Sequence, residues 1–577
     1  MGDLPVSVNA RIADELKRQG VRAVFTLMSE ETAKLIVEVD RRGIALYSTR
    51  HDSTAVGMAD GYARASGEVG VAIVGRGPGL TNALNPLITA AKAGTGIVVL
   101  IGDSPNGFQD PVRAKSARAE RVGKHIEQVT LLDSLDIPNV TVQSPSTAVA
   151  EIARCFERAR AGNVVAVNMP GDVLEAAAPE GKGSALESEL VEPAGPSPED
   201  ISLVADLLGE SWAARHPVII AGHGAVESRA HDELRRLGEL TGSLMASTLL
   251  ANSFFRDDPY NIGFVGTMST PLGSELVTDS DLILAFGASL NPYTTYRGDL
   301  LHGARVVQFD TNPNASGRYH RTELAVVGDA RLAAQALVKE LERRGHKAAG
   351  YRSAEIAARI KSFDLGDTVT DQADRAGLDP RKVMIELDKV LPPERTLVVD
   401  GGHHFEFAVA HIGVPDPRGF IFANEYFAVG CGLAAALGAA VARPDRLTVL
   451  DIGDGGMMMN LGDIDTAVRY RLPLVIIVTN DGGFGSEIHY LQVNGLPDQT
   501  ARYENPSFAD VAVSLGAKGI TIDSLDKIGE VRSAIHGLAG PLVLDCKVTT
   551  SVRAGWVDFL FTKDSRARPA GETVKPG

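Results

Sequence analysis

Runs of consecutive apolar residues recur along this 577-residue chain, each about the length of one β-strand. They lie at residues 69–75, 96–102, 163–170, 217–224, 281–289, 305–310, 396–402, 446–455 and 473–481. Strands that are apolar at nearly every position are typical of parallel sheets that are buried on both faces. Because helical patterns separate the runs, we predict an α/β fold of mainly parallel sheets flanked by helices.

Two polar stretches divide the chain into thirds. Residues 178–199 are rich in Pro, Gly, Ser and Glu, and residues 345–380 lack a strong strand pattern. A chain of this length is too long for one core, so we predict three domains, bounded by these linkers. The first and last thirds read as similar doubly wound units. The polar residues 563–577 are predicted to form a disordered tail, with a lid over an active site as the alternative.

Composition excludes several classes of protein. A net charge of -16 argues against a nucleic-acid surface, which needs clustered Lys and Arg. Three widely spaced cysteines fit a reducing compartment better than a disulfide scaffold or a zinc site. Without a signal-peptide pattern or a run of 18 apolar residues, the sequence predicts a cytoplasmic protein with no membrane contact.

The most specific stretch is LDIGDGGMMMNLGDIDTAVRYRLPLVIIVTNDGGFGSE, residues 450–487. It reads as a strand, a Gly-Asp-Gly-Gly turn at 453–456, a helix over 461–470, a strand over 474–479 and an Asn-Asp-Gly-Gly turn at 480–483. Two strands joined by one crossover helix lie side by side in a parallel sheet. We therefore expect Asp454 and Asp481 to converge at the carboxyl edge of that sheet.

Two carboxylates at this edge suit Mg²⁺, which prefers few protein ligands together with phosphate oxygens. The glycines of both turns would let backbone N–H groups approach those phosphates. The alternative is an ordinary β–α–β unit with acidic turn residues. A lone Gly-Asp-Gly would favour that alternative, whereas the whole combination favours a metal and phosphate site.

The stretch resembles the cofactor-binding signature of thiamine-diphosphate-dependent enzymes. The resemblance implies that Mg²⁺ is bound by the side chains of Asp454 and Asp481 and by the backbone carbonyl of Gly483. Asp481 stands where the family usually has Asn, which adds negative charge. The other cofactor-binding positions that it implies here are Gly453, Gly455, Gly456 and Phe484.

Other segments fall in the order seen in acetolactate synthase-like enzymes, and the resemblance covers nearly the whole chain. Relatives of this kind include benzaldehyde lyase, 2-hydroxyacyl-CoA lyase-like and pyruvate decarboxylase-type enzymes. The resemblance implies a pyrimidine-binding domain over 1–180, a middle Rossmann-like domain over 195–345 and a diphosphate-binding domain over 375–577. In that family the cofactor lies between the first domain of one subunit and the third of another. A homodimer is therefore the implied minimum, and tetramers are common.

Asp52 lies in RHDSTAVGMADGYARASG, residues 50–67, where the family has the glutamate that hydrogen-bonds the pyrimidine ring of the cofactor. Burial beside an apolar cofactor would raise the pKa of this acid into a range that suits proton exchange near neutrality. Aspartate is one methylene shorter, so contact needs a backbone shift or a bridging water. Asp52 could instead only cap the helix that follows. His51 has either a role in the pocket or a structural role.

Two further segments match cofactor-contacting positions. GRGPGLTN, residues 75–82, matches a family turn close to the cofactor and includes Gly77 and Asn82. Arg76 in this turn could pair with Asp52 or with a substrate carboxylate, or form an outward salt bridge. Val429 matches the hydrophobic wedge that holds the cofactor bent, and the alternative is a buried valine at a helix start.

Three more residues are candidates for the chemistry. His403 and His404 follow a predicted strand end and could contact phosphate or move protons. In the alternative, one of the two is exposed and the other has its hydrogen bonds satisfied within the fold. Glu487 lies six residues after Asp481, which matches a catalytic glutamate of pyruvate decarboxylase-like enzymes. Its alternative is a first-turn glutamate favoured by the helix dipole.

These features predict a lyase, carboligase or decarboxylase that acts on 2-oxo acids, 2-hydroxy ketones or diketones through an acyl anion carried on the cofactor. The segment 287–301 departs from the flavin-holding pattern, which argues against FAD and leaves an ADP- or CoA-type nucleotide open. One alternative is acetolactate synthase proper. Another is a weakly catalytic regulatory homologue, which the aspartate at position 52 motivates. The expected partners are a small carbonyl substrate and other copies of the chain.

Overall fold

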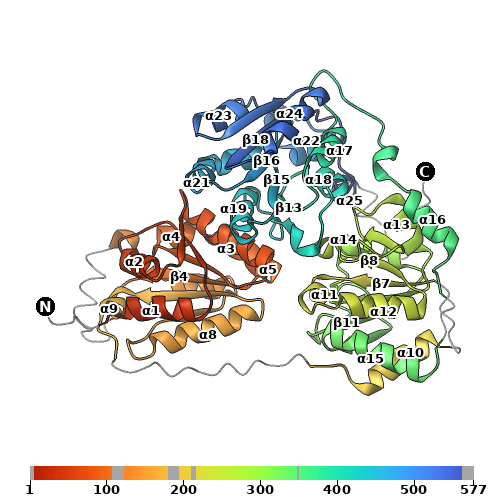
Figure 1. Cartoon of the computed structure of the whole chain (residues 1–577), viewed down its shortest axis with the longest axis horizontal. Helices are drawn as coiled ribbons and strands as arrows, with labels where there is room; N and C mark the ends of the chain where they lie inside the picture. The colour runs from red at the N-terminus through yellow and green to blue at the C-terminus, as the bar shows by residue number, and fades with distance from the viewer. Residues whose placement is uncertain (1–5, 107–121, 180–193, 210–215, 347–349, 562–577) are drawn as a thin grey trace.

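The computed structural model describes residues 6–106, 122–179, 194–209, 216–346 and 350–561. Within them the chain forms three domains, each built on a six-stranded parallel sheet flanked by helices (Figure 1). The predicted fold class is confirmed, and every apolar run named above contains a strand. The polar tail at 563–577 lies outside the described residues, as does most of the linker at 178–199.

The first domain contains the sheet β2-β1-β3-β4-β6-β5. Its strands are β1 Ala23–Thr26, β2 Ala45–Ser48, β3 Gly70–Val74, β4 Ile97–Asp103, β5 Asn139–Thr141 and β6 Val164–Pro170. Its helices are α1 Val8–Arg18, α2 Ala33–Arg41, α3 Asp52–Ser66, α4 Pro78–Asn82, α5 Leu84–Ala93, α7 Gln128–Ser134, α8 Ala148–Arg160 and α9 Gly171–Glu175. Strands β3 and β6 are buried at every position, because helices cover both faces of the sheet.

The middle domain has the strand order β12-β11-β10-β7-β8-β9, which is the order of dinucleotide-binding folds. Its strands are β7 Pro217–Ala221, β8 Leu244–Ser247, β9 Asn261–Phe264, β10 Leu282–Phe286, β11 Arg305–Asp310 and β12 Leu324–Val327. Its helices are α10 Pro198–Leu208, α11 His223–Glu227, α12 His231–Thr241, α13 Pro271–Thr278, α14 Pro292–Thr295 and α15 Ala330–Arg343. The stretch 345–380, predicted as a linker, contains the further helix α16, Ala354–Ser362.

The third domain has the sheet β14-β13-β15-β16-β18-β17. Its strands are β13 Arg395–Val399, β14 Phe420–Phe422, β15 Leu447–Gly453, β16 Leu474–Asn480, β17 Lys518–Ile522 and β18 Pro541–Lys547. Its helices are α17 Pro380–Val390, α18 Phe405–His411, α19 Gly432–Ala442, α20 Asp454–Met459, α21 Ile464–Arg469, α22 Gly485–Val493, α23 Phe508–Ser514, α24 Ile528–Ile535 and α25 Gly555–Phe561. Counted within each domain, this strand order repeats that of the first domain, which confirms that the two units are similar.

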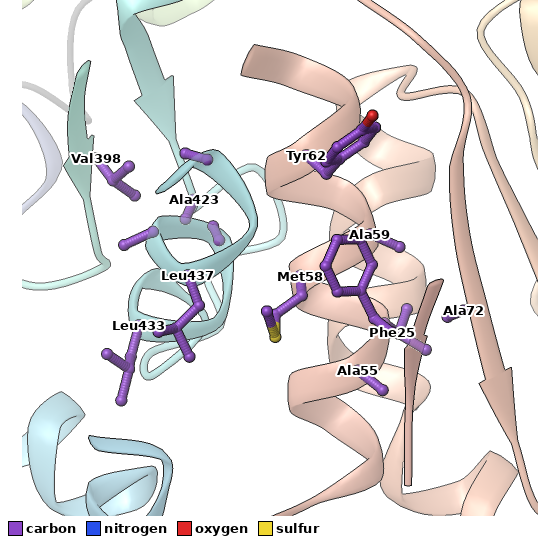
Figure 2. Close-up of a cluster of buried hydrophobic side chains, with 14 of the residues drawn as sticks. Phe25, Ala55, Met58, Ala59, Tyr62, Ala72, Val398, Ala423, Leu433 and Leu437 are labelled. Atoms are coloured by element: carbon purple, nitrogen blue, oxygen red, sulfur yellow. The ribbon is translucent and has the colours of Figure 1, made fainter. Parts of the chain in front are cut away.

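Helices α3 and α19 join the first and third domains through one continuous core. In Figure 2, Met58 points from α3 toward Leu433 and Leu437 of α19, and all three side chains are fully buried. Each buried side chain of this size contributes about 1.5–3 kcal/mol. Glycines allow the close approach: a Cβ on Gly61 would lie 2.0 Å from the Ala435 carbonyl oxygen. A bulkier residue there would separate the helices.

Candidate functional site

The two acidic turns of the third domain meet at the carboxyl edge of its sheet. Strands β15 and β16 pair in parallel, with Gly453 opposite Thr479, so both strands end at the same level. Asp454 begins α20 and Asp481 follows β16. The backbone N–H of Gly482 donates to Asp454 Oδ2 at 3.0 Å, so the turns are in contact.

The crossover between these strands differs in detail from the prediction. We predicted one helix over 461–470, whereas the structure has α20, a 3-10 turn over Leu461–Asp463 and α21. Because α20 begins at Asp454, the backbone N–H groups of the Gly-Asp-Gly turn lie at the N-terminus of a helix. This is the geometry in which a helix N-terminus favours an anion.

Asp454 is held by donors that sequence reasoning missed. Asn505 Nδ2 donates to its Oδ2 at 2.6 Å, and the hydroxyl of Tyr503 donates to its Oδ1 at 3.1 Å. Burial nevertheless raises the pKa of Asp454. Burial, followed by the charge of Asp454, raises the pKa of Asp481 to about 7. Two neighbouring acidic side chains, of which Asp454 disfavours the ionised form of Asp481, are a good match for a divalent cation.

The surroundings of these carboxylates fit a metal-bound diphosphate. A Cβ on Gly455 would lie 2.9 Å from the Phe484 ring, and one on Gly485 would lie 2.6 Å from Asp481 Oδ2. Glycine at these positions therefore keeps the turns open to a ligand. Across the described ranges, no group of three or more His, Cys, Asp and Glu side chains is arranged to hold a metal. Mg²⁺ bound here would complete its shell with backbone, phosphate and water oxygens.

His404 is a buried cation beside the turns. Its Nδ1 lies 2.7 Å from Asp451 Oδ2 and its Nε2 lies 3.3 Å from the Gly401 carbonyl oxygen, so both nitrogens face acceptors. Burial alone would lower its pKa, but the charge of Asp451 and the hydrogen bond to it raise the pKa to about 9. The imidazolium therefore persists at neutral pH. A positive charge here favours an anionic ligand.

His403 is buried too, but it is neutral. Burial and the neighbouring His489 and His404 lower the pKa of His403 to about 3. Its Nε2 lies 2.9 Å from the Val552 carbonyl oxygen and 3.1 Å from His489 Nε2. The predicted alternative, in which one of the two adjacent histidines is exposed, is therefore wrong. Sequence reasoning missed His489, because only the fold brings α22 beside the end of β13.

Apolar and acidic side chains surround this edge. Val429 is 40% exposed, which rules out the alternative of a buried valine at a helix start. Phe427 and Phe484 nearby are also exposed. Glu487 lies in the first turn of α22 and lines the cavity described below. Its position is compatible with both predicted roles, because a first-turn glutamate is also favoured by the helix dipole, and the catalytic role stays a prediction.

In the first domain, Asp52 is the first residue of α3 and is buried. The N-cap is His51, whose Nδ1 accepts a hydrogen bond from the Ser53 N–H at 3.2 Å. The predicted alternative that Asp52 caps the helix is therefore wrong, because the extended residue before it already accepts that bond. Asn82 Nδ2 donates to Asp52 Oδ2 at 3.1 Å, and burial raises the pKa of Asp52.

Arg76 pairs with a residue that we did not consider, and its predicted pairing with a substrate carboxylate stays a prediction. Its side chain is buried, its Nε donates to Glu31 Oε1 at 2.9 Å and its Nη1 donates to Ser104 Oγ at 2.6 Å. The outward salt bridge is therefore wrong, and no hydrogen bond from Arg76 to Asp52 is found in the described residues. Gly77 follows with a φ of 58°, where a Cβ would lie 2.3 Å from the Lys124 carbonyl oxygen. Only glycine fits at this turn.

A cavity of about 2300 Å³ connects the third-domain site to the middle domain. The predicted site residues that line it are His403, His404, Val429, Gly453, Asp454, Gly455, Gly456, Asp481, Gly483, Phe484 and Glu487. It also reaches the carboxyl ends of β7, β10 and β11, where doubly wound folds bind nucleotides. Asp52, His51, Gly77 and Asn82 are not among its described lining residues. Other first-domain residues, such as Arg64 and Gly67, do line it. Within one chain, the structure thus assembles the predicted third-domain site residues around this cavity but not the predicted first-domain ones.

Comparisons with known proteins agree along the chain. Three family models match: the N-terminal TPP binding domain of thiamine pyrophosphate enzymes over 6–132, their central domain over 204–337 and their C-terminal TPP binding domain over 400–546. In the described part of the chain, no helix is long and apolar enough to span a membrane.

Individual relatives align over most of their length. The acetolactate synthase large subunit of Parasynechococcus marenigrum (strain WH8102) is 27% identical over 94% of this chain and 88% of its own. The sulfoacetaldehyde acetyltransferase of Castellaniella defragrans is 28% identical, over 88% of this chain and 87% of its own. Acetolactate synthase 1, chloroplastic, of Zea mays is 29% identical, over 92% and 84%.

Proposed function

This chain belongs to the thiamine pyrophosphate enzymes, and from that premise we propose that it is a Mg²⁺-dependent lyase, carboligase or decarboxylase. It makes or breaks a C–C bond next to a carbonyl group in 2-oxo acids, 2-hydroxy ketones or diketones. The observation that supports this most is the contact between the Asp454 turn and the Asp481 turn, beside a buried, cationic His404.

The third domain holds the cofactor in this proposal. The carboxylates of Asp454 and Asp481 and the carbonyl of Gly483 bind Mg²⁺, and the glycine turns accommodate the diphosphate. His404 offsets the negative charge that the diphosphate brings. When bound, thiamine diphosphate supplies the electron sink for C–C cleavage that protein side chains lack.

Asp52 holds the proton that activates the cofactor. Its raised pKa keeps part of the carboxyl protonated closer to neutrality, so it can donate to and accept from a ring nitrogen. Asn82 orients this carboxyl through its hydrogen bond. Glu487 and the neutral His403 line the cavity on the third-domain side, where they exchange protons with the substrate.

We propose that the complete site lies between two copies of the chain. Asp52, His51, Gly77 and Asn82 do not line the third-domain cavity of their own chain, and His51 and Asn82 are exposed. The apolar Phe427, Val429 and Phe484 are exposed at the other half. A second copy would cover both surfaces, giving a homodimer at least.

The proposed domain boundaries remain 1–180, 195–345 and 375–577.

Two alternatives can be tested by experiment: acetolactate synthase proper and a weakly catalytic homologue. Acetolactate synthase proper is supported by the names of several relatives, whereas the position of Glu487 and the altered segment 287–301 favour a lyase or carboligase. The same segment argues against FAD, while the cavity along the middle sheet leaves an ADP- or CoA-type nucleotide open. A weakly catalytic homologue would bind the cofactor without turnover.

The test uses purified protein with thiamine diphosphate and Mg²⁺. We would offer pyruvate, benzoylformate, benzoin and acyloins, and measure C2 proton exchange of the cofactor by NMR. We expect exchange and turnover of at least one substrate, and neither with Asp454→Ala. Acetolactate from pyruvate alone would favour the synthase. Binding without exchange or turnover would contradict the enzymatic proposal.

A further inference from the structure

The turn that carries Asp52 is bonded to the third domain of the same chain. Ser48, at the end of β2, donates from its backbone N–H to the hydroxyl of Tyr470 at 2.6 Å, and its carbonyl accepts from Arg469 Nη2 at 2.5 Å. The Arg50 side chain donates to Asp465 at 2.6 Å. These contacts join the β2–α3 turn to the crossover segment that follows the Gly-Asp-Gly turn.

Asp463 lies at the centre of this junction and is 2% exposed. Its Oδ1 accepts from the Arg50 backbone N–H at 2.9 Å and from Thr466 Oγ1 at 2.7 Å. Its Oδ2 accepts from Thr54 Oγ1 at 2.6 Å. Two of these donors belong to the first domain and one to the third. A buried carboxylate with three short hydrogen bonds is a rigid connection, since bonds to an ionised acceptor are roughly twice as strong as neutral ones.

The two first-domain donors stand on either side of Asp52. Arg50 precedes it by two residues and Thr54 follows it by two, so one carboxylate fixes both ends of the turn. The position at which α3 begins, and hence the direction of the Asp52 side chain, depends on that turn. Asp463 itself ends the short 3-10 turn after α20, which starts at Asp454.

We propose that Asp463 is a positioning residue for Asp52. It clamps the Arg50–Thr54 turn so that the Asp52 carboxyl is held ready for the cofactor. It touches neither cofactor nor substrate and acts only through this turn. The inference rests on the proposed function, because it gives Asp52 its activating role. In the proposed dimer, each Asp463 therefore orients the Asp52 of its own chain. That Asp52 belongs to the site formed with the third domain of the other chain, and not to the site that contains the Asp454 of the same chain.

The central experiment compares two matched variants, Thr54→Val and Thr466→Val. Each removes one hydroxyl donor to Asp463 with little change in shape, but only Thr54 lies beside Asp52 in the first domain. Thr466→Val also removes a 3.3 Å bond from Arg469 Nη2, which keeps its 2.5 Å bond to the Ser48 carbonyl. The first readout is amide hydrogen exchange over residues 48–54, in protein without added cofactor. The second is the rate of C2 proton exchange with thiamine diphosphate and Mg²⁺. The third is the midpoint of a Mg²⁺ titration.

For Thr54→Val we expect amide exchange over 48–54 to be about tenfold faster and C2 exchange about tenfold slower, as for the loss of one interaction of roughly this strength. The Mg²⁺ midpoint should stay unchanged. Thr466→Val should alter neither exchange rate by more than about twofold. Equal effects of the two variants on C2 exchange would overturn the proposal. A slower C2 exchange that is explained by weaker Mg²⁺ binding would also overturn it.

Asp463→Asn tests the clamp more severely, with Asp465→Asn as its control. Among the described residues, Asp465 bonds the side chains of Arg50 and Arg469 but no backbone group of the turn, and the Arg50 side chain is 56% exposed. Its variant should therefore slow C2 exchange much less than Asp463→Asn does. Asp463→Asn should slow it more than Thr54→Val does. If Asp463→Asn does not fold, the threonine pair still decides. Absence of C2 exchange in the unmodified protein would contradict the proposed function, while amide exchange over 48–54 would still decide whether Asp463 holds the turn.

Discussion

The two halves of the proposed site are built in different ways. The third-domain half comes mainly from two turns that one crossover unit brings together, and Asp454 alone accepts from four donors. The first-domain half is one buried acid, Asp52, whose carboxyl is oriented by Asn82 from another helix. A sheet edge preorganises the first of these halves. The second depends on distant segments and, in our proposal, on a second chain.

This difference indicates which kind of substitution should abolish the function of each half of the site. The metal and phosphate side should fail when a ligand is removed, because its geometry is already fixed by the sheet. The acid side should fail when its orientation is disturbed, even if Asp52 itself remains. Variants of Asp454, Asp52 and Asp481 should separate these two kinds of failure.

The largest effect is expected for Asp454→Ala. A bound metal ion is worth several kcal/mol of charge stabilisation, so turnover should fall by about 1000-fold or more. Cofactor binding should be lost with it, as measured by isothermal titration with thiamine diphosphate and Mg²⁺. Retention of tight, Mg²⁺-dependent binding would show that the metal lies elsewhere.

Asp52→Ala should slow C2 exchange by about 100- to 10,000-fold, the range for a lost general acid–base group. The Mg²⁺ titration should stay near that of the unmodified protein, in contrast to Asp454→Ala. Asp52→Glu restores the side-chain length usual in the family and should retain or increase exchange. A change in melting temperature alone, with normal C2 exchange, would show that Asp52 has only a structural role.

Asp481→Asn should weaken Mg²⁺ binding by about tenfold, as for a perturbed metal site, and change its pH dependence. The pKa of Asp481 is raised to about 7, so protons compete with the metal and affinity should increase as the pH rises toward 7. Mg²⁺ titrations between pH 5 and pH 8 would measure this, pH values chosen to span roughly the shifted range. With Asn, that pH dependence should become flatter.

The same shift has a consequence for stability without the metal. A carboxyl with a raised pKa in the folded state stabilises the protein below its ordinary pKa of about 4, and this contribution is lost as the pH rises through the folded value. Metal-free protein should therefore lose stability between about pH 4 and about pH 7. Asp481→Asn should lose less, which thermal melts across this range would reveal. Identical pH profiles of melting would contradict the assignment.

The smallest expected effect is a partial return of activity in mixed dimers, and it distinguishes a site between two chains from a site within one chain. In heterodimers that combine an Asp52→Ala chain with an Asp454→Ala chain, one site would carry both changes and the other neither. Because a symmetric dimer has two equivalent sites, about half of the activity should return. Each homodimer should be inactive under the same conditions. Heterodimers without activity would mean that both halves of a site come from one chain.

Much of the fold could be predicted from the sequence, because strands buried on both faces leave uninterrupted apolar runs such as the one that became β16. The convergence of Asp454 and Asp481 also follows from sequence, since one crossover joins their strands. The broken crossover helix was not foreseen, because the apolar pattern over 461–470 does not distinguish a continuous helix from two short ones.

The remaining contacts of the site leave no local pattern. Tyr503 and Asn505 reach Asp454 from a loop beyond α22, and Arg50 meets Asp463 from another domain. The N-cap was missed for a different reason. Asp52 has a typical capping side chain, but the chain is extended at His51, so the histidine ring accepts the bond instead.

The close glycine contact between α3 and α19 limits which substitutions these two helices can accept during evolution. A Cβ on Gly438 would lie 2.0 Å from the Met58 carbonyl oxygen, just as one on Gly61 would meet the Ala435 carbonyl oxygen. Neither position can accept a larger residue unless the opposite helix moves at the same time. Substitutions in these two helices should therefore appear together in descendants of this sequence, although most of the chain separates them.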